Sequence, residues 1–179
     1  MVAEFLFHNI IKVKVFIKIK YFLLYSFFFS LCFSAFAKDT QEILSTTKVI
    51  ITDGDTIKFN NKKIRLHGID TPEIKQLCKN KNGEDYKCGV KAKLALINLI
   101  SSHQVKCSVH GKDRYKRLIA TCFVKNININ EWLVKKGWAL AYRRYSKDYV
   151  DEELFAKNNK LGLWRGDFSE PWKWRRLKK

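Results

Sequence analysis

Acidic and arginine side chains lie together in three short segments of the sequence, residues 53–56, 65–73 and 113–117. Carboxylates can hold a hard cation, and a guanidinium can bind a phosphate through two parallel hydrogen bonds. Hydrolysis of a phosphodiester needs an activated water and a way to neutralise the negative charge that grows on the phosphate oxygens. The three segments therefore carry the groups that this reaction needs, provided that the fold brings them together.

Two aspartates are the candidate metal ligands. Asp55 and Asp70 are each expected at the end of a strand, on the rim of a barrel, with the backbone carbonyl of Thr71 as a third donor. Because all three donors are oxygens, Ca²⁺ or a similar hard cation is favoured over zinc or copper. The alternative is a solvated turn, since Asp and Gly are frequent in turns. Asp53 either tunes the site from behind the ligands or only caps that turn.

Three further side chains are candidates for the catalytic steps. Glu73 is the candidate general base, and the alternative is a surface Glu that begins a helix after Pro72. Arg65 and Arg117 are the candidate phosphate clamps, because a planar guanidinium meets two oxygens at once. For Arg65 the alternative is an ordinary salt bridge to Asp55 between two strands.

Aromatic and basic side chains in the second half of the chain are candidates for binding a nucleotide. Tyr115 and Tyr142 either stack on a base or hydrogen-bond to it, or else pack in the barrel. Arg114, the two arginines at 143–144 and the aromatic, basic tail at 172–176 are candidates for contacts with substrate. The alternative for the tail is a docked C-terminus whose Trp side chains pack on the domain.

The first 37 residues have the pattern of an export leader. Four lysines precede an uncharged, aromatic-rich run that ends in Ala35-Phe36-Ala37, a small-x-small cleavage signal. We expect cleavage after Ala37, which leaves about 140 residues for one domain. The alternative is an uncleaved membrane anchor, because the run from Lys20 to Lys38 is close to the length that spans a bilayer.

The chain is strongly basic. Its formal net charge is +18, and removal of the leader with its four Lys and one Glu leaves +15. A field of this sign attracts polyanions, either nucleic acid or an anionic membrane surface. The charge by itself does not choose between these two partners.

Four cysteines remain after the leader with Cys32 is removed, and an even number in an exported protein indicates disulfides. Three pairings are possible. Because Cys78 and Cys88 share a loop and Cys107 and Cys122 fall on neighbouring strands, we favour Cys78–Cys88 and Cys107–Cys122. The alternative is a zinc site of four thiolates, which the lack of a C-x-x-C pair disfavours.

Five strands are predicted from β-branched and alternating apolar residues. They cover residues 48–52, 56–59, 63–69, 105–110 and 118–124. Asn60-Asn61 is a turn signal between the second and third strands, and Gly111 to Arg117 form the tip of a hairpin between the last two.

Three helices are predicted, at residues 90–100, 130–137 and 147–161. Asn130 is a candidate cap for the second helix, and Gly137 ends it. The first and third helices have apolar residues at helical spacing. These are Val90, Leu94, Ile97 and Ile100 in the first and Val150, Leu154 and Leu161 in the third.

The order of these elements predicts a mainly β, α+β fold, a five-stranded barrel of the OB type with about three helices. The chain divides into a signal peptide, a short linker, the OB-fold domain and a basic aromatic tail. Their predicted bounds are 1–37, 38–46, 47–167 and 168–179.

The acidic and arginine segments resemble the three motifs of the staphylococcal-nuclease-like (thermonuclease) family, in order and approximate spacing. The matching residues are 53–56, Arg65 with 70–73, and 113–117, and the likeness runs from about Lys48 to Trp164. It implies an OB-fold barrel and Ca²⁺-dependent cleavage of both DNA and RNA. The expected products carry a 3′-phosphate and a free 5′-hydroxyl.

The resemblance also implies roles for individual residues. Asp55, Asp70 and the Thr71 carbonyl correspond to calcium ligands, Arg65, Glu73 and Arg117 to catalytic residues, and Tyr115 and Tyr142 to nucleotide contacts. Residues 139–145, the final tail and the four cysteines are similar to the secreted or periplasmic bacterial branch. The chain departs from the family at Lys116, where Gly is usual, so we expect a stiffer tip or a small shift of Arg117.

We therefore expect an exported, periplasmic or secreted, Ca²⁺-dependent nuclease that does not discriminate between sugars. DNA and RNA are its expected partners, and we expect a monomer without a stable protein partner. The first rival hypothesis is a non-catalytic nucleic-acid-binding OB-fold module, which would keep the basic groove and lose the acidic set. The second rival is a membrane-tethered surface protein that uses its charge to sit on lipid.

Overall fold

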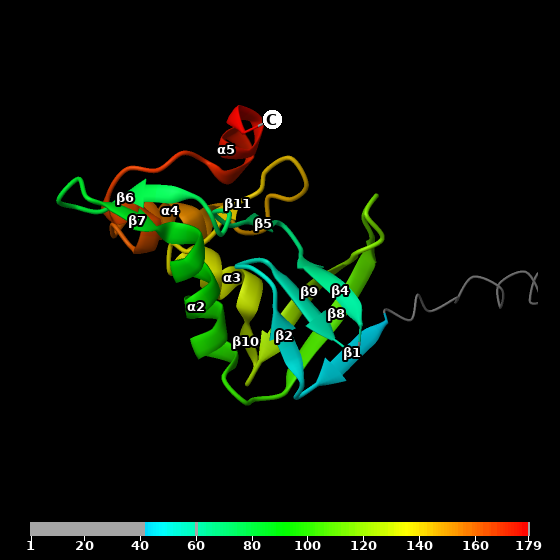
Figure 1. Ribbon diagram of the computed structural model, residues 1–179. Coiled ribbons are helices and arrows are strands. Elements are labelled where there is room, and N and C mark those ends of the chain that lie inside the picture. The colour runs from blue at the N-terminus through cyan, green and yellow to red at the C-terminus, as the bar shows by residue number, and fades with distance from the viewer. Residues whose placement is uncertain (1–41, 60, 179) are drawn as a thin grey trace, which may run out of the picture. The chain divides into compact units, whose positions relative to one another are not determined.

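The computed structural model describes residues 42–59 and 61–178. The predicted signal peptide and its cleavage point after Ala37 lie outside these residues. The described part of the chain forms a curled sheet with helices on one side and at one end of it (Figure 1). None of the helices in this part is long and apolar enough to cross a membrane.

The main sheet contains all five predicted strands, so the predicted OB-type, α+β arrangement is confirmed. Its order is β1-β8-β9-β4-β3-β2, with β10 paired to β9, and only β4 and β9 run parallel. The strands are β1 (Ile43–Thr46), β2 (Val49–Ile51), β3 (Thr56–Phe59), β4 (Lys62–Leu66), β8 (Val105–Lys112), β9 (Leu118–Val124) and β10 (Ile127–Asn128).

Alternation along the strands decides which side chains enter the core. In β4, Ile64 and Leu66 are buried in the core cluster, so Arg65 between them points to the opposite face of the sheet. Asn61 begins the return into β4 with a φ of 68°, a left-handed conformation that Asn tolerates. The alternation and the turn together place Arg65 where a second layer of side chains can cover it.

Helix α2 (Cys88–Ile100) packs against β2 and α3 (Ile129–Lys135). Its buried face includes Ala92, Leu96 and Ile100, whereas Leu94 is 44% exposed and Ile97 is 38% exposed. The predicted apolar face is therefore wrong at Leu94 and Ile97, whereas Ile100 is buried as its spacing indicated. Apolar residues lie on more than one side of this helix, and the side with the small Ala92 is the one that approaches the rest of the protein.

The caps and ends of the next two helices also differ from the prediction. Asn128 caps α3 by accepting from the backbone N–H groups of Asn130 and Glu131, so the predicted cap at Asn130 is wrong. Helix α4 (Val150–Asn158) is shorter than predicted and buries Glu153 rather than Leu154, which is 48% exposed. Glu153 is turned inward because its carboxylate accepts from the backbone N–H of Ala141 at 3.0 Å.

Both predicted disulfides are confirmed. Cys107 and Cys122 lie directly opposite each other on β8 and β9. Cys78–Cys88 joins β6 (Leu77–Lys79) to the first residue of α2, across the hairpin that β6 forms with β7 (Asp85–Lys87). This second bridge fixes the loop that follows Glu73, the last residue of the 65–73 segment.

Two segments at the edges of the predicted domain have regular structure. Residues 43–46, expected to be part of a linker, form β1 and pair with β8. The predicted tail contains a helix, α5 (Pro171–Leu177), which follows the short 3-10 helix η1 (Gly162–Arg165). The ordered body thus continues on both sides of residues 47–167.

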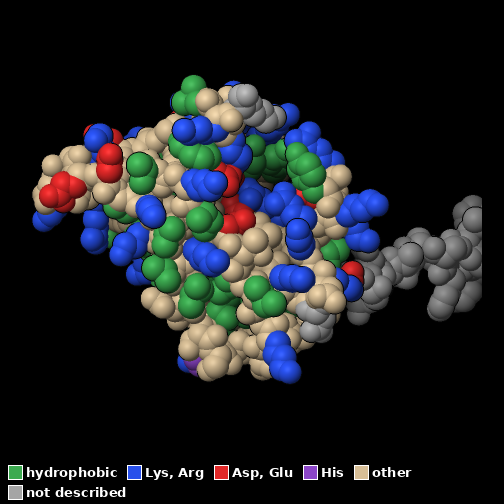
Figure 2. Space-filling view, viewed as in Figure 1, with side chains coloured by type: hydrophobic (Ala, Val, Ile, Leu, Met, Phe, Trp, Pro, Cys, Tyr) green, Lys and Arg blue, Asp and Glu red, His purple; other side chains and the backbone are tan. Residues whose placement is uncertain are grey.

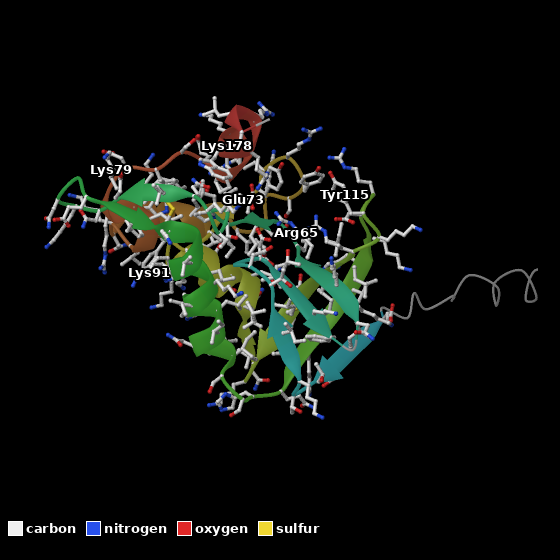
Figure 3. All side chains as sticks on the ribbon, viewed as in Figure 1. Arg65, Glu73, Lys79, Lys91, Tyr115 and Lys178 are labelled. Carbon is white, nitrogen blue, oxygen red and sulfur yellow. A yellow bond between two sulfur atoms is a disulfide. The ribbon has the colours of Figure 1, made fainter. Side chains whose placement is uncertain are left out.

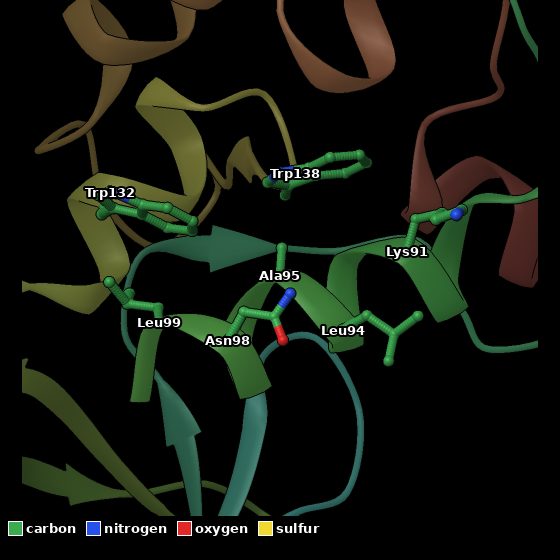
Figure 4. Close-up of a pocket in the computed structure, with 7 residues that line it drawn as sticks. All are labelled: Lys91, Leu94, Ala95, Asn98, Leu99, Trp132 and Trp138. Carbon is green, nitrogen blue, oxygen red and sulfur yellow. The ribbon is translucent and has the colours of Figure 1, made fainter. Parts of the chain in front are cut away.

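A cavity of about 510 Å³ lies beside α2, next to α3 (Figure 4). Its lining consists of Lys91, Leu94, Ala95, Asn98, Leu99, Trp132 and Trp138. The lining contains no carboxylate, so this cavity lacks the groups that phosphodiester chemistry requires. The candidate site lies elsewhere.

Candidate active site

Neighbouring strands bring together the acidic and arginine side chains of the first two segments. Thr56 of β3 is paired with Arg65 of β4, so Asp55, the residue just before β3, lies beside Arg65. Asp70 ends the short strand β5 (Ile69–Asp70), which pairs with β11 (Leu140–Ala141). The chain between β4 and β5 is only a turn, which brings Asp70 back to the same place.

Arg65 bridges the two candidate metal ligands. Its Nη1 donates to Oδ1 of Asp55, and its Nη2 donates to Oδ1 of Asp70 at 2.7 Å and to the carbonyl of Ile69 at 3.3 Å. Burial would lower the pKa of the guanidinium, but the charges of Asp55 and Asp70 raise it above its ordinary value. The guanidinium is therefore a permanent positive charge between two carboxylates.

Asp55 is buried and fully hydrogen-bonded. Besides Arg65, its carboxylate accepts from Oγ1 of Thr56 at 3.1 Å and from both N (2.9 Å) and Oγ1 (3.1 Å) of Thr71. A Cβ at Gly54 would lie 2.7 Å from Oγ1 of Thr71, so glycine allows the loop before β3 to approach. Burial would raise the pKa of Asp55, but the Arg65 charge and these hydrogen bonds lower it below its ordinary value.

The two neighbouring aspartates have raised pKa values. Burial raises the pKa of Asp70, and the charge of Asp55 adds to the rise while two guanidinium groups oppose it. Asp53 accepts from the backbone N–H of Asp55 at 3.1 Å. Burial raises its pKa to about 6, with a further contribution from the Asp55 charge. Asp53 thus lies next to Asp55, and its bond to a backbone N–H two residues on is the turn contact of the second sequence interpretation.

Glu73 lies on a loop that is held against α2. Its N–H donates to Oε1 of Gln76 at 3.2 Å, and its carbonyl accepts from the Gln76 N–H at 2.8 Å. A Cβ at Gly89 would lie 2.0 Å from the Glu73 carbonyl oxygen, so only glycine permits this contact. No helix begins directly after Pro72, since the next helix is α2 at Cys88, and the Glu73 side chain is 38% exposed. Glu73 is positioned by its backbone and open to water.

Arg175 of α5 also enters the site, and the sequence reasoning did not single it out. Its Nη1 donates to Oε1 of Glu73 at 2.9 Å, and Nη1 and Nη2 donate to the two oxygens of Asp70 at 3.1 and 2.7 Å. The composition of the basic tail indicates contacts with the backbone of a nucleic acid, but it carries no information about a single partner 105 residues away in the chain. Pro171 at the start of a helix was the available signal that the tail is ordered.

Arg117 lies on the same face of the sheet as Arg65 but has other partners. Arg65 is paired with Ile119 across β4 and β9, and Arg117 is two residues before Ile119, so alternation carries its side chain to the Arg65 face. Its Nε donates to Oδ2 of Asp113 at 2.7 Å. Lys116 has a φ of 63°, the left-handed conformation that Gly favours, so the tip keeps a glycine-type backbone despite the substitution.

The candidate nucleotide contacts fall into two places. Tyr115 is 66% exposed at the β8–β9 tip, and the guanidinium carbon of Arg114 lies 4.9 Å from its ring centroid. Tyr142 instead stacks on Trp172 at 5.4 Å between ring centroids. Tyr142 and Trp172 line a cavity of about 260 Å³ together with Ala141, Arg143, Arg144 and Arg176.

Figure 3 shows Arg65 and Glu73 near the middle of one face, with Tyr115 farther out on the β8–β9 hairpin. On the same face, a small acidic patch is enclosed by Lys and Arg side chains (Figure 2). A basic surface of this kind attracts a polyanion.

The chemistry of the ligand set fits a hard cation, but its hydrogen bonds are directed elsewhere in this structure. Asp55 and Asp70 supply carboxylate oxygens, the donors that Ca²⁺ prefers. Among the described residues no three His, Cys, Asp or Glu side chains are grouped as a ready metal site. The oxygens of Asp70 face Arg65 and Arg175 instead.

Comparison with known proteins assigns the chain to a family. Residues 63–166 match the family described as Staphylococcal nuclease homologue. The chain is 34% identical over 157 residues to an uncharacterized endonuclease of Haemophilus influenzae, with 83% of each chain covered. It is 32% identical over 150 residues to the micrococcal nuclease of Shigella flexneri, with 73% of this chain and 80% of that protein covered.

A further relative bears a name of another kind. The chain is 36% identical over 128 residues to the succinoglycan biosynthesis protein ExoI of Rhizobium meliloti, and the match covers 70% of this chain and 66% of ExoI. The fold, the family match and the likeness to the endonuclease and the micrococcal nuclease define the class of the protein as a hydrolase of phosphodiester bonds. The chain belongs to the staphylococcal nuclease family.

Proposed function

We propose that this chain is an exported, Ca²⁺-dependent nuclease that cleaves both DNA and RNA and leaves 3′-phosphate and 5′-hydroxyl ends. The observation that carries the proposal is the bridge from Arg65 to the buried carboxylates of Asp55 and Asp70, with Glu73 on the adjoining loop. Burying carboxylates costs free energy unless they are paired and hydrogen-bonded. A surface that only binds nucleic acid has no need of them.

In this proposal Arg65 binds and neutralises the scissile phosphate. Three of its five N–H donors are directed to Asp55, Asp70 and Ile69, and the other two can donate to a phosphate oxygen. The two carboxylates hold the guanidinium in place before substrate arrives, so little reorganisation is needed as charge builds on phosphorus. Arg117 reaches the same face from the neighbouring strand and serves as the second clamp, leaving Asp113 or bridging it to phosphate.

Glu73 orients the attacking water and accepts its proton at a carboxylate oxygen. Its partial exposure admits water, and its backbone is held by Gln76 and by the first turn of α2. Asp55, Asp70 and the Thr71 carbonyl are the residues that would hold Ca²⁺, which when bound supplies positive charge to the phosphate oxygens. Asp53 supports Asp55 by accepting a hydrogen bond from the backbone N–H of Asp55.

Aromatic and basic residues around this centre bind the rest of the substrate. Tyr115 and Arg114 on the exposed hairpin tip can stack on a base and contact a phosphate. Tyr142 lines a cavity with three arginines, a composition suited to a nucleotide with its phosphate. Stacking on a base and hydrogen bonds to a phosphate do not distinguish DNA from RNA, which supports cleavage of both.

The rival function is a nucleic-acid-binding module without catalysis. The basic surface and the OB-type fold serve such a module equally well. What favours the nuclease is the acidic set, because carboxylates next to a phosphate site weaken simple binding by repulsion. The two functions therefore predict opposite effects of removing Glu73.

The test is digestion of plasmid DNA and of RNA by the purified protein, first with Ca²⁺ and then with EGTA. We expect cutting only with Ca²⁺, and Glu73→Gln is expected to lower the rate about 100-fold or more while binding is retained. Glu84→Gln is the matched control, because Glu84 is an exposed carboxylate on the β6–β7 turn. Binding without cutting under both conditions would favour the module.

Export is the remaining part of the proposal. Two disulfides are typical of an oxidising compartment, and they support the predicted leader. The mass and N-terminal residue of the protein recovered from a producing cell test it, with Lys38 as the expected first residue. A mature protein that begins at Met1 and fractionates with membranes would support the anchored alternative.

A further inference from the structure

Helix α5 brings a second guanidinium into the acidic site from the far end of the chain. Arg175 donates to both oxygens of Asp70, at 3.1 and 2.7 Å, and to Oε1 of Glu73 at 2.9 Å. One side chain thus holds a candidate metal ligand and the candidate general base at the same time.

The segment that leads into α5 fixes the helix in this place. Buried Gln76 donates from Nε2 to the Ser169 carbonyl at 2.6 Å, and Pro171 at the start of α5 is buried. The Trp172 ring stacks on Tyr142 with only 7° between the ring planes. Arg175 is therefore delivered by an anchored helix and is not a loose surface side chain.

Hydrogen bonds already occupy almost all acceptor positions of the two aspartates. An ionised carboxylate offers about four such positions. Asp55 accepts four hydrogen bonds, and Asp70 accepts one from Arg65 and two from Arg175. Without Arg175, Asp70 would keep only the bond from Arg65, and both of its oxygens would be open to a cation.

We propose that Arg175 is a positioning residue that competes with the divalent cation for Asp70 and thereby sets the cation affinity of the site. A guanidinium and a hard dication need the same oxygens and repel each other at contact distance. The cation is bound after the Arg175 side chain leaves Asp70, and the same movement frees Glu73. This inference rests on the cation-dependent nuclease function proposed above.

Replacement of Arg175 by the cation at Asp70 needs no opening of the core. The Arg175 side chain is 35% exposed and that of Glu73 is 38% exposed, so the guanidinium can turn out to water. At low cation concentration Asp70 and Glu73 stay paired with Arg175, and the site becomes competent only when the cation displaces Arg175.

The size of the effect follows from the population of the closed contact. An apparent dissociation constant equals the intrinsic constant divided by the competent fraction, so a contact closed in about nine molecules of ten weakens binding about tenfold. Removing the guanidinium is expected to restore that factor.

The test is a calorimetric titration of Ca²⁺ alone into the mature protein, purified after the producing cell has processed it. Arg175→Ala and Arg175→Gln are expected to bind Ca²⁺ about tenfold more tightly than wild type. Lys178→Ala is the control, because it removes one positive charge at the end of the same helix, where Lys178 lies over the Trp174 ring. Its Ca²⁺ affinity is expected to match wild type within about twofold, the scale of a distant, screened charge.

A second measurement follows the helix itself. Hydrogen–deuterium exchange in residues 171–177 is expected to rise when Ca²⁺ is added to wild type and to be high already in the two Arg175 variants. Circular dichroism establishes that each variant is folded, and either Arg175 variant suffices if the other does not fold.

Three results would overturn the inference. Equal Ca²⁺ affinity in wild type and the Arg175 variants, or weaker binding in those variants, removes the competition and leaves the nuclease proposal standing. An equal gain in Lys178→Ala reduces the effect to net charge. If none of the proteins binds Ca²⁺ and cutting ignores EGTA, the proposed cation-dependent function fails together with the inference.

Discussion

Replacing Arg65 with Ala is expected to destabilise the fold as well as to stop catalysis. The Arg65 side chain is 19% exposed and lies between Asp55, which is 3% exposed, and Asp70, which is fully buried. Removing one partner of a buried ion pair typically costs about 3–5 kcal/mol of the free energy of unfolding. Because Asp70 keeps Arg175 and Asp55 keeps three other hydrogen bonds, we expect about 3 kcal/mol, the low end of that range.

The loss should depend on pH in a definite direction. In wild type the pKa of Asp55 lies below its ordinary 3.8, so this group stabilises the fold above pH 3.8 and the contribution is lost as pH falls. Without Arg65 the charge that opposes burial is lost, so we expect the pKa of Asp55 to rise and the ionised carboxylate to stabilise the fold less as pH rises. The two stability curves should therefore lie farthest apart at neutral pH and converge below about pH 4.

The assay is urea unfolding of both proteins between pH 3 and pH 8, in EDTA so that no cation contributes. Lys63→Ala is the control, since Lys63 is an exposed residue of the same strand and carries the same charge. Its curve is expected to stay within about 0.5 kcal/mol of wild type at every pH. Arg65→Lys keeps the positive charge but loses the planar guanidinium that bonds both Asp55 and Asp70, so we expect an intermediate loss of stability.

A flat difference between wild type and Arg65→Ala across this pH range would refute the reasoning. It would mean that lost packing, rather than two unpaired carboxylates, accounts for the destabilisation. Near-normal nuclease turnover in Arg65→Ala would separately remove its role as a phosphate clamp.

Three further predictions concern the stability of the surrounding structure, each measured by chemical unfolding. Asp53→Asn should stabilise the protein above pH 6 by at most about 3 kcal/mol, because burial and the Asp55 charge raise the pKa of Asp53 from 3.8 to about 6. This gain in stability should shrink as pH falls and vanish below about pH 4. Replacing both Cys107 and Cys122 with Ala should cost about 3 kcal/mol, since this disulfide closes a loop with a sequence separation of 15, and no cost would contradict that account. Asn130→Ala should cost about 3 kcal/mol, because the Cys122 N–H and the His67 carbonyl would lose the buried amide as partner, whereas the Ala120 carbonyl keeps the His67 N–H; an unchanged midpoint would show that the two groups find other partners.

The central acidic and arginine pair could be predicted from the sequence because its parts are local. Asp55 and Arg65 are ten residues apart on two strands joined by a tight turn, and Asp70 follows within one more turn. Short separations and alternation restrict such residues to one neighbourhood. The cysteine pairing followed for the same reason, since Cys107 and Cys122 fall on the two arms of one hairpin.

Helix faces and caps were harder to predict. Helix α2 is apolar on more than one side, and contact with β2 and α3 decides that Ala92, Leu96 and Ile100 turn inward. At the start of α3, two asparagines are equally good caps by type, and tertiary contacts assign the cap to Asn128 and a buried hydrogen-bonding role to Asn130.

The sequence by itself determined the chemistry that is available here: the types of the reactive groups, their order along the chain and the hairpin that joins the first of them. Only the tertiary structure decided that the guanidinium of Arg175 is paired with Asp70 and Glu73. Arg175 is separated from Asp70 by 105 residues, and no periodicity or motif spans such a distance. The contact exists because Gln76 and Trp172 dock the end of the chain beside the site, and docking of that kind is a property of packed surfaces.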